Sequence, residues 1–337
     1  MQTVTDRPKL SVVIPVYGSA PILPELVRQL EEVLSNRFNI DNAYEVILVD
    51  DCGPGNGWLV IRQLADLYPF VKGVGLRKNV GQHNAIMAGL NYAEGDVVVV
   101  MDDDLQHSPY DVPSLYSRIL EGYDVCYADF QNRQHALWKI LGSKFNDFVA
   151  SYLLKKPRDL YLSPFKAFTR GVRHELIKYT GPYVYLDGLI LTITSRISTT
   201  PVTHHSRYSG EGGYGLKKSL SLWLKMATNF SIAPLRLASI GGMLFSLVGF
   251  LFAVFFILQK IVGGHVPQGW TSTIVVVLFM GGIQLLALGA IGEYLGRVYL
   301  SINRRPQYVV SELLNLDVSK SDLEDGNGST IVRSAPL

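Results

Sequence analysis

Residues 96–109 read DVVVVMDDDLQHSP, an uninterrupted apolar run that ends in three consecutive aspartates. Four valines in a row are typical of a strand buried on both faces, as in a parallel sheet covered by helices. In an open α/β sheet, ligands bind beyond the carboxyl ends of the strands. The stretch therefore predicts an α/β fold with a polar site directly after Met101.

Strand and helix patterns alternate on the amino-terminal side of this stretch. Apolar, β-branched runs predict strands at 11–17, 45–51 and 71–76. Apolar residues at helical spacing predict helices at 23–34, 58–68 and 82–93. Strands that alternate with helices indicate a mainly parallel sheet with helices on its faces.

The charged residues of the chain are unevenly distributed. They make up 18% of the 337 residues, whereas soluble proteins average about 25%. Two windows, 237–259 and 266–292, contain no Asp, Glu, Lys or Arg. Because a helix of about 20 apolar residues crosses a bilayer, we predict two transmembrane helices at about 237–259 and 270–292. The alternative is a pair of buried core helices.

Basic residues predict how this hairpin is oriented. They lie on both outer flanks of the two windows, whereas the loop between them carries only Lys260. The positive-inside rule then places both termini and the preceding domain in the cytoplasm, at the inner (plasma) membrane. Two cysteines are compatible with a reducing compartment. A net charge of +2 argues against nucleic acid as a partner.

These patterns divide the chain into four predicted parts. Residues 1–215 form the cytoplasmic α/β domain, and 216–235 form a basic amphipathic helix that lies at the membrane surface. Residues 236–296 hold the two transmembrane helices. Residues 297–337 form a cytoplasmic segment that is expected to be disordered after about residue 316.

The three aspartates after Met101 predict a metal site. Alternate residues of an extended segment share a side, so Asp102 and Asp104 are expected to point one way and Asp103 another. Adjacent carboxylates repel one another unless a cation neutralises them. Oxygen ligands favour Mg²⁺ or Mn²⁺, and Mg²⁺ commonly joins carboxylates to a substrate diphosphate. The alternative is a solvated acidic turn.

Two further segments carry candidate binding groups. Asp50 and Asp51 end the second strand, where a carboxylate can accept hydrogen bonds from a base or ribose, or cap the next helix. Residues 76–83 (LRKNVGQH) lead from a strand into a helix whose amino terminus favours an anion. The glycine-rich loop 210–218 predicts either a phosphate-binding lid or a linker. Its GxGxxG string lies outside a βαβ unit, which argues against an oxidoreductase.

The runs SVVIPVY, EVILVDD, NVGQ and MDDDLQHSP follow one another in this order and are similar to those of family-two glycosyltransferases with the GT-A fold. With the two apolar windows and the ending GEYLGRVY…RRPQYVV, the chain resembles the polyprenyl-phosphate glycosyltransferases, in the bactoprenol glucosyltransferase branch related to dolichol-phosphate mannose synthase. The resemblance covers about residues 10–310.

The resemblance implies roles for individual residues. The implied metal ligands are Asp102, Asp104 and Gln106. The nucleotide sugar would contact Pro15, Tyr17, Asp50, Asp51, Asp102 and Asp103. Phosphates would contact Arg133, Lys166, Arg207, Tyr214, Lys217 and Lys218, with either Lys217 or Lys218 replacing a family lysine at Gly213. The catalytic candidates are Asp104 with Asp159 and Asp187, the last two orienting the nucleophile or serving a structural role.

The implied reaction is inverting transfer of a hexose, glucose from UDP-glucose, to undecaprenyl phosphate at the cytoplasmic face. A phosphate monoester is largely dianionic at about pH 7, so the acceptor needs no strong base. Galactose, mannose from GDP-mannose and a modified pentose are open alternatives for the sugar. A processive polysaccharide synthase and a non-catalytic membrane scaffold are alternative functions. Relatives also suggest a homo-oligomer.

Overall fold

The computed structural model describes residues 8–37, 43–130, 160–181, 184–202, 233–261, 269–303 and 306–316. These residues fall into two compact units. The first holds everything described up to residue 202 together with residues 306–316. The second holds two long helices.

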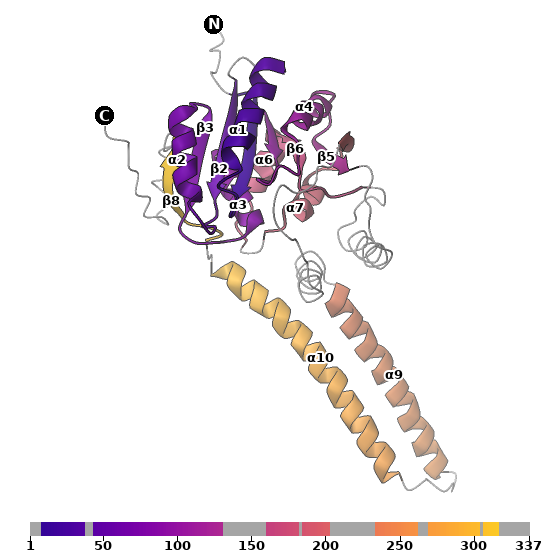
Figure 1. The fold of residues 1–337 in the computed structure, drawn as a ribbon. Helices are drawn as coiled ribbons and strands as arrows, with labels where there is room; N and C mark the ends of the chain where they lie inside the picture. Colours follow the sequence, from indigo (N-terminus) through magenta and orange to yellow (C-terminus); the bar gives the residue numbers. More distant parts are fainter. Residues whose placement is uncertain are drawn as a thin grey trace. The chain divides into compact units, whose positions relative to one another are not determined.

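An eight-stranded sheet forms the centre of the first unit, in the order β7-β5-β6-β4-β1-β2-β3-β8 (Figure 1). Its strands are β1 (Leu10–Val16), β2 (Tyr44–Asp50), β3 (Val71–Leu76), β4 (Val97–Val100), β5 (Val125–Phe130), β6 (Lys166–Thr169), β7 (Ile197–Val202) and β8 (Val310–Leu314). The four central strands β4, β1, β2 and β3 run parallel. The mainly parallel sheet is therefore confirmed, and these four strands agree with the predicted ranges to within one residue.

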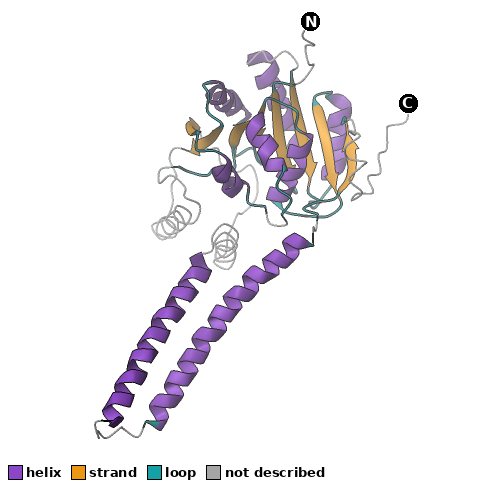
Figure 2. Ribbon diagram, turned by 180° about the vertical axis from the view of Figure 1, so that it is seen from behind, coloured by secondary structure: helices purple, strands orange, loops and turns teal. Residues whose placement is uncertain are grey.

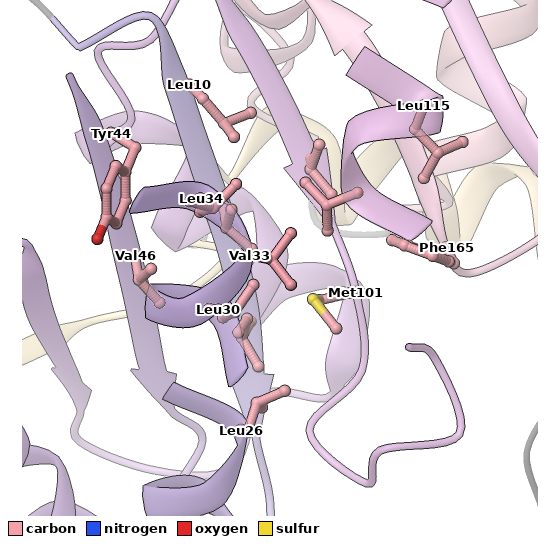
Figure 3. Close-up of a cluster of buried hydrophobic side chains, with 14 of the residues drawn as sticks. Leu10, Leu26, Leu30, Val33, Leu34, Tyr44, Val46, Met101, Leu115 and Phe165 are labelled. Carbon is pink, nitrogen blue, oxygen red and sulfur yellow. The ribbon is translucent and has the colours of Figure 1, made fainter. Parts of the chain in front are cut away.

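Helices cover both faces of the sheet, and Figure 2 distinguishes them in purple from the orange strands. One apolar core packs beneath α1 (Leu23–Glu31), α2 (Gly57–Leu67) and α4 (Val112–Leu120). Figure 3 shows part of this core, including Leu30, Met101 and Phe165. The other core packs beneath α3 (Gln82–Tyr92), α6 (Arg170–Ile177) and α7 (Leu186–Ile193). Alternate residues of β1 enter opposite cores, as strand geometry requires.

Two short helical turns differ from the prediction: one replaces the end of a predicted helix, and the other was not predicted. The helix predicted at 23–34 ends at Glu31 and continues as a π-helical turn, η1 (Glu32–Arg37). A 3-10 turn, η2 (Pro109–Asp111), precedes α4, and the Ser108 hydroxyl caps it by accepting from the amide of Tyr110. This turn ends the loop that contains the three aspartates.

Strand β8 lies far along the chain from β3, its neighbour in the sheet, and no strand was predicted there from the sequence. It pairs antiparallel with β3 at the edge of the sheet. Glu312 accepts from the indole of Trp58 at 2.9 Å and pairs with Arg62 at 2.7 Å. Asn315 donates to the carbonyls of Ala65 and Val71. The chain beyond the second unit is thereby fastened to the α/β domain. The predicted disorder after about residue 316 lies outside the described residues.

The second unit contains α9 (Ala233–Ile261) and α10 (Trp270–Ile302), which contact each other and lie side by side in Figure 1. Two long helices are therefore present where two were predicted. Within the described residues, one stretch, Phe279–Leu300, is long and apolar enough to cross a membrane. It lies further along the chain than the predicted span 270–292. Residues 240–252 form a shorter apolar stretch, so the pair of spans is not confirmed.

Candidate active site at the carboxyl edge of the sheet

The loops that follow β1, β2 and β4 lie together because these three strands are parallel neighbours. Pro15 is buried within β1 opposite Val49, and Tyr17, directly after the strand, is 59% exposed. Asp50 ends β2, and the next amide, of Asp51, donates to the carbonyl of Val16 at 3.0 Å. The sequence-predicted nucleotide residues thus lie along one edge of the sheet.

Asp103 joins two of these loops. Its Oδ2 accepts hydrogen bonds from the amide of Tyr17, at 2.9 Å, and from the hydroxyl of Ser19. Burial raises the pKa of the Asp103 carboxyl, and the two hydrogen bonds oppose that rise. The middle aspartate therefore holds the loop after β1 against the loop after β4.

Asp102 is held by two partners of its own. Its Oδ1 accepts from the side-chain amide of Gln82 at 2.6 Å, and its backbone amide donates to Nδ1 of His107 at 3.1 Å. His107 is buried and its ring stacks on those of Phe130 and Phe165. Because Nδ1 accepts, a neutral His107 carries its proton on Nε2, which lies 3.9 Å from Oδ2 of Asp102.

Asp104 and Gln106 form a compact turn. The amide of Gln106 donates to Oδ1 of Asp104 at 3.1 Å, and Leu105 between them has a φ of 57°. This left-handed backbone is uncommon for a residue with a side chain. It reverses the chain so that Gln106 returns toward Asp104, as in a turn closed by an aspartate side chain.

The donor set of this loop fits a hard divalent cation. Asp102, Asp104 and Gln106 offer carboxylate and amide oxygens, which suit Mg²⁺ or Mn²⁺. Among the described residues, no group of three or more His, Cys, Asp or Glu side chains is arranged to hold a metal. Mg²⁺ in proteins commonly joins one or two carboxylates to the phosphate oxygens of a substrate.

Asp51 has a different environment from the one expected of a nucleotide ligand. It is 3% exposed, its Oδ1 accepts from the amide of Val80 at 2.7 Å, and its Oδ2 accepts from Gly81 and Asn79. The amides of Val80 and Gly81, which precede α3, were expected to bind an anion. In the structure they bind the carboxylate of Asp51. Burial raises the pKa of Asp51, and also that of Asp50, where the neighbouring Asp51 adds to the effect.

Lys166 and Asp187 form a buried ion pair. Lys166 is 2% exposed and Asp187 7% exposed. The ammonium group of Lys166 contacts Oδ1 of Asp187, and the hydroxyl of Tyr127 donates to the same oxygen at 3.1 Å. Lys166 begins β6 and pairs with Val100, so the ion pair lies beside the strand that leads into the three aspartates.

Several predicted site residues lie outside the described part of the chain. They are Arg133, Asp159, Arg207, Tyr214, Lys217 and Lys218. Other residues were not predicted and are revealed by the structure: Ser19, Gln82, His107 and Tyr127. Gln82 and His107 belong to the runs NVGQ and MDDDLQHSP, so these motifs could have identified them as site residues. Ser19 and Tyr127 have no such signal, because only the tertiary fold brings them to Asp103 and Asp187.

The contacts of Asp103 predict how its variants behave. Asp103→Asn keeps an oxygen that accepts from Tyr17 and Ser19, so its free energy of unfolding should stay within about 1 kcal/mol of wild type. Asp103→Ala loses both bonds and should lower it by about 1–3 kcal/mol. Urea unfolding of the purified full chain in detergent, followed by tryptophan fluorescence, measures both. Equal destabilisation by the two substitutions would contradict the linking role of Asp103.

Sequence comparison places the chain among known enzymes. The sequence profile of the family described as glycosyl transferase family 2 matches residues 11–178. The undecaprenyl-phosphate 4-deoxy-4-formamido-L-arabinose transferase of Proteus mirabilis is 31% identical over 331 residues, which are 96% of this chain and 100% of that protein. The Aeromonas hydrophila protein of the same name is 32% identical, over 95% of this chain and 98% of its own length.

Comparison of structures finds more distant likenesses. Glucosyl-3-phosphoglycerate synthase from Mycobacterium tuberculosis has a TM-score of 0.47 at 15% identity, over 66% of this chain and 80% of that chain. S. aureus TarS 1-349 has a TM-score of 0.41 at 20% identity, over 57% of this chain and 58% of that chain.

Proposed function

Since this chain belongs to glycosyl transferase family 2 and to its polyprenyl-phosphate sugar transferases, we propose that it transfers a sugar from a nucleoside diphosphate to undecaprenyl phosphate. The observation that carries the proposal is the extent of the similarity. The relatives named for this acceptor match the chain over 96% of its length, the helices α9 and α10 included.

The sugar is proposed from the same relatives. The relatives compared above are named for 4-deoxy-4-formamido-L-arabinose, a modified pentose. Glucose from UDP-glucose, the expectation from the sequence motifs, has no support from these relatives. We therefore propose the nucleotide-linked formamido pentose as the first donor to test, with UDP-glucose as a comparison.

A divalent cation would be held by Asp102, Asp104 and Gln106. When bound, it neutralises the charge that develops on the departing diphosphate. Gln82 and His107 hold Asp102 in place, and the Leu105 turn holds Gln106 near Asp104. These contacts orient the carboxylates of Asp102 and Asp104 before any substrate arrives, and such preorganisation lowers the barrier of a reaction.

The other residues of the edge contact the substrates. Pro15, Tyr17 and Asp50 are proposed to contact the nucleotide, with Asp51 and Asp103 fixing the loops that carry them. Lys166 is proposed to face a phosphate, with Asp187 positioning its ammonium group. An oxygen of the lipid phosphate attacks the anomeric carbon of the sugar, the bond from that carbon to the diphosphate breaks, and the anomeric configuration inverts.

The membrane arrangement is part of the proposal. Large apolar side chains are exposed along both α9 and α10, for example Met243 (73%), Ile261 (74%) and Leu285 (70%). Such continuous apolar exposure is unfavourable in water and normal in lipid. We propose that both helices cross the membrane, with residues 1–215 and 297–337 cytoplasmic, 216–235 at the interface, and the chain assembled as a homo-oligomer. A lipid acceptor explains why a sugar-nucleotide domain needs such an anchor.

The proposal predicts the outcome of a transfer assay. Purified full chain in nanodiscs is incubated with Mg²⁺, undecaprenyl phosphate and one radiolabelled donor: UDP-4-deoxy-4-formamido-L-arabinose, UDP-glucose or GDP-mannose. We expect labelled lipid from the first donor at a kcat/KM at least about tenfold above the others. Labelled lipid from UDP-glucose alone would restore the glucose assignment. Absence of lipid product with every donor, while the protein remains folded, would contradict the transferase function.

A further inference from the structure

His83 lies next to the acidic loop but has no part in the contacts described so far. It is the second residue of α3, directly after Gln82, whose side chain bonds Asp102. Its ring meets that of Tyr185 edge-on, with centroids 5.5 Å apart. The Lys166–Asp187 pair is near enough to influence it electrostatically. His83 is therefore the immediate chain neighbour of a residue that bonds Asp102, and it lies within electrostatic range of the buried ion pair.

One nitrogen of His83 has no partner. Nδ1 is buried and makes no hydrogen bond, although the residue as a whole is only half-buried. Burial lowers the pKa of the imidazole, and so does Lys166, while Asp187 opposes them. The ring is therefore neutral near pH 7. Because protein atoms enclose Nδ1, Nε2 is the ring nitrogen through which His83 would bond a ligand.

We propose that His83 contacts the sugar of the donor, using Nε2 of its imidazole to hydrogen bond a hydroxyl or amide group of that sugar. The proposal rests on the proposed function. The diphosphate of the donor is expected at Asp102 and Asp104, and the sugar is the next group along the substrate. A neutral ring suits an uncharged hydroxyl or amide, whereas Lys166 suits a phosphate. His83 would thus help to determine which sugar is accepted.

A sugar-contacting role and a structural role of His83 predict different effects of its replacement on stability. An unpartnered buried polar atom is unfavourable, so replacing it with an apolar group of similar shape is neutral or stabilising. His83→Phe should therefore unfold at the same temperature as wild type or a higher one, while it binds the donor sugar more weakly. A residue that merely supported the fold would lose stability and binding together.

The experiment measures binding without the lipid acceptor. Full chain in detergent with Mg²⁺ is titrated calorimetrically with UDP, UDP-4-deoxy-4-formamido-L-arabinose and UDP-glucose. His83→Phe should weaken binding of at least one UDP-sugar about tenfold and binding of UDP less than about twofold. His83→Gln, whose amide can reach the position of Nε2, should recover most of the loss. His174→Phe, at an exposed position on α6, is the matched control and should change neither.

Several results would overturn the proposal. One is an equal loss of UDP and UDP-sugar affinity, which would place His83 at the nucleotide or diphosphate. Another is unchanged binding of both UDP-sugars by His83→Phe and by a second variant, His83→Leu. In the transfer assay described above, a rise in His83→Phe confined to the KM of undecaprenyl phosphate would place His83 at the acceptor. Failure of the transferase function is distinguishable, because it appears as UDP-sugar binding without lipid product in the wild-type protein.

Discussion

Replacing Asp104 by asparagine is expected to lower sugar transfer by about 10²- to 10³-fold while the protein stays folded. The asparagine keeps the oxygen that accepts from the amide of Gln106, so the turn closed at 3.1 Å is preserved. It loses the negative charge through which Asp104 would hold a divalent cation. Transfer to undecaprenyl phosphate is measured at saturating donor across a range of Mg²⁺ and Mn²⁺ concentrations.

Asp103→Asn is the matched control, since it removes one carboxylate from the same run of three. Asp103 bonds the loop after β1, so its asparagine variant should retain most of the activity and the wild-type dependence on the cation. Removal of divalent cations with EDTA should stop transfer by the wild-type protein, and added Mg²⁺ or Mn²⁺ should restore it. Near-normal turnover of Asp104→Asn with metal present would exclude Asp104 as a metal ligand.

The second large effect is expected at the buried pair of Lys166 and Asp187. Lys166→Met leaves the carboxylate of Asp187 buried without its cation, with only the hydroxyl of Tyr127 still donating to its Oδ1. Removing one partner of a buried ion pair costs about 3–5 kcal/mol. We expect a loss of this size in urea unfolding of the full chain in detergent, together with a loss of transfer.

A triple variant separates stability from function at this pair. The triple variant combines Tyr127→Phe, Lys166→Met and Asp187→Leu. It removes all three polar groups at once, so none of them is left buried without a partner. Replacing a buried pair by apolar residues of similar volume is often neutral or stabilising, so the triple variant should regain most of the stability lost by Lys166→Met. If Lys166 faces a phosphate, transfer stays low. Full transfer by the stable triple variant would show that the pair is only structural.

Local sequence was sufficient for the central part of the fold. Strands β1 to β4 agree with prediction because each is a short apolar run with flanking turn residues, and period and length are read directly from such runs. Strand β8 was not predicted, because its pairing depends on contacts with Trp58 and Arg62, about 250 residues away along the chain. Edge strands of this kind are determined by their partners more than by their own composition.

Within the candidate site, the sequence by itself identified the oxygen-rich loop, Asp102, Asp104 and Gln106, because three carboxylates after a buried strand are recognisable from order alone. Only the tertiary structure decided how the remaining groups are used. In the structure, both oxygens of Asp51 accept hydrogen bonds from the amides that precede α3. Asp103 bonds the loop after β1, and Lys166 pairs with Asp187. The physical reason is that a buried polar group must find its partner in space. These partners lie between 21 and 86 residues apart along the chain.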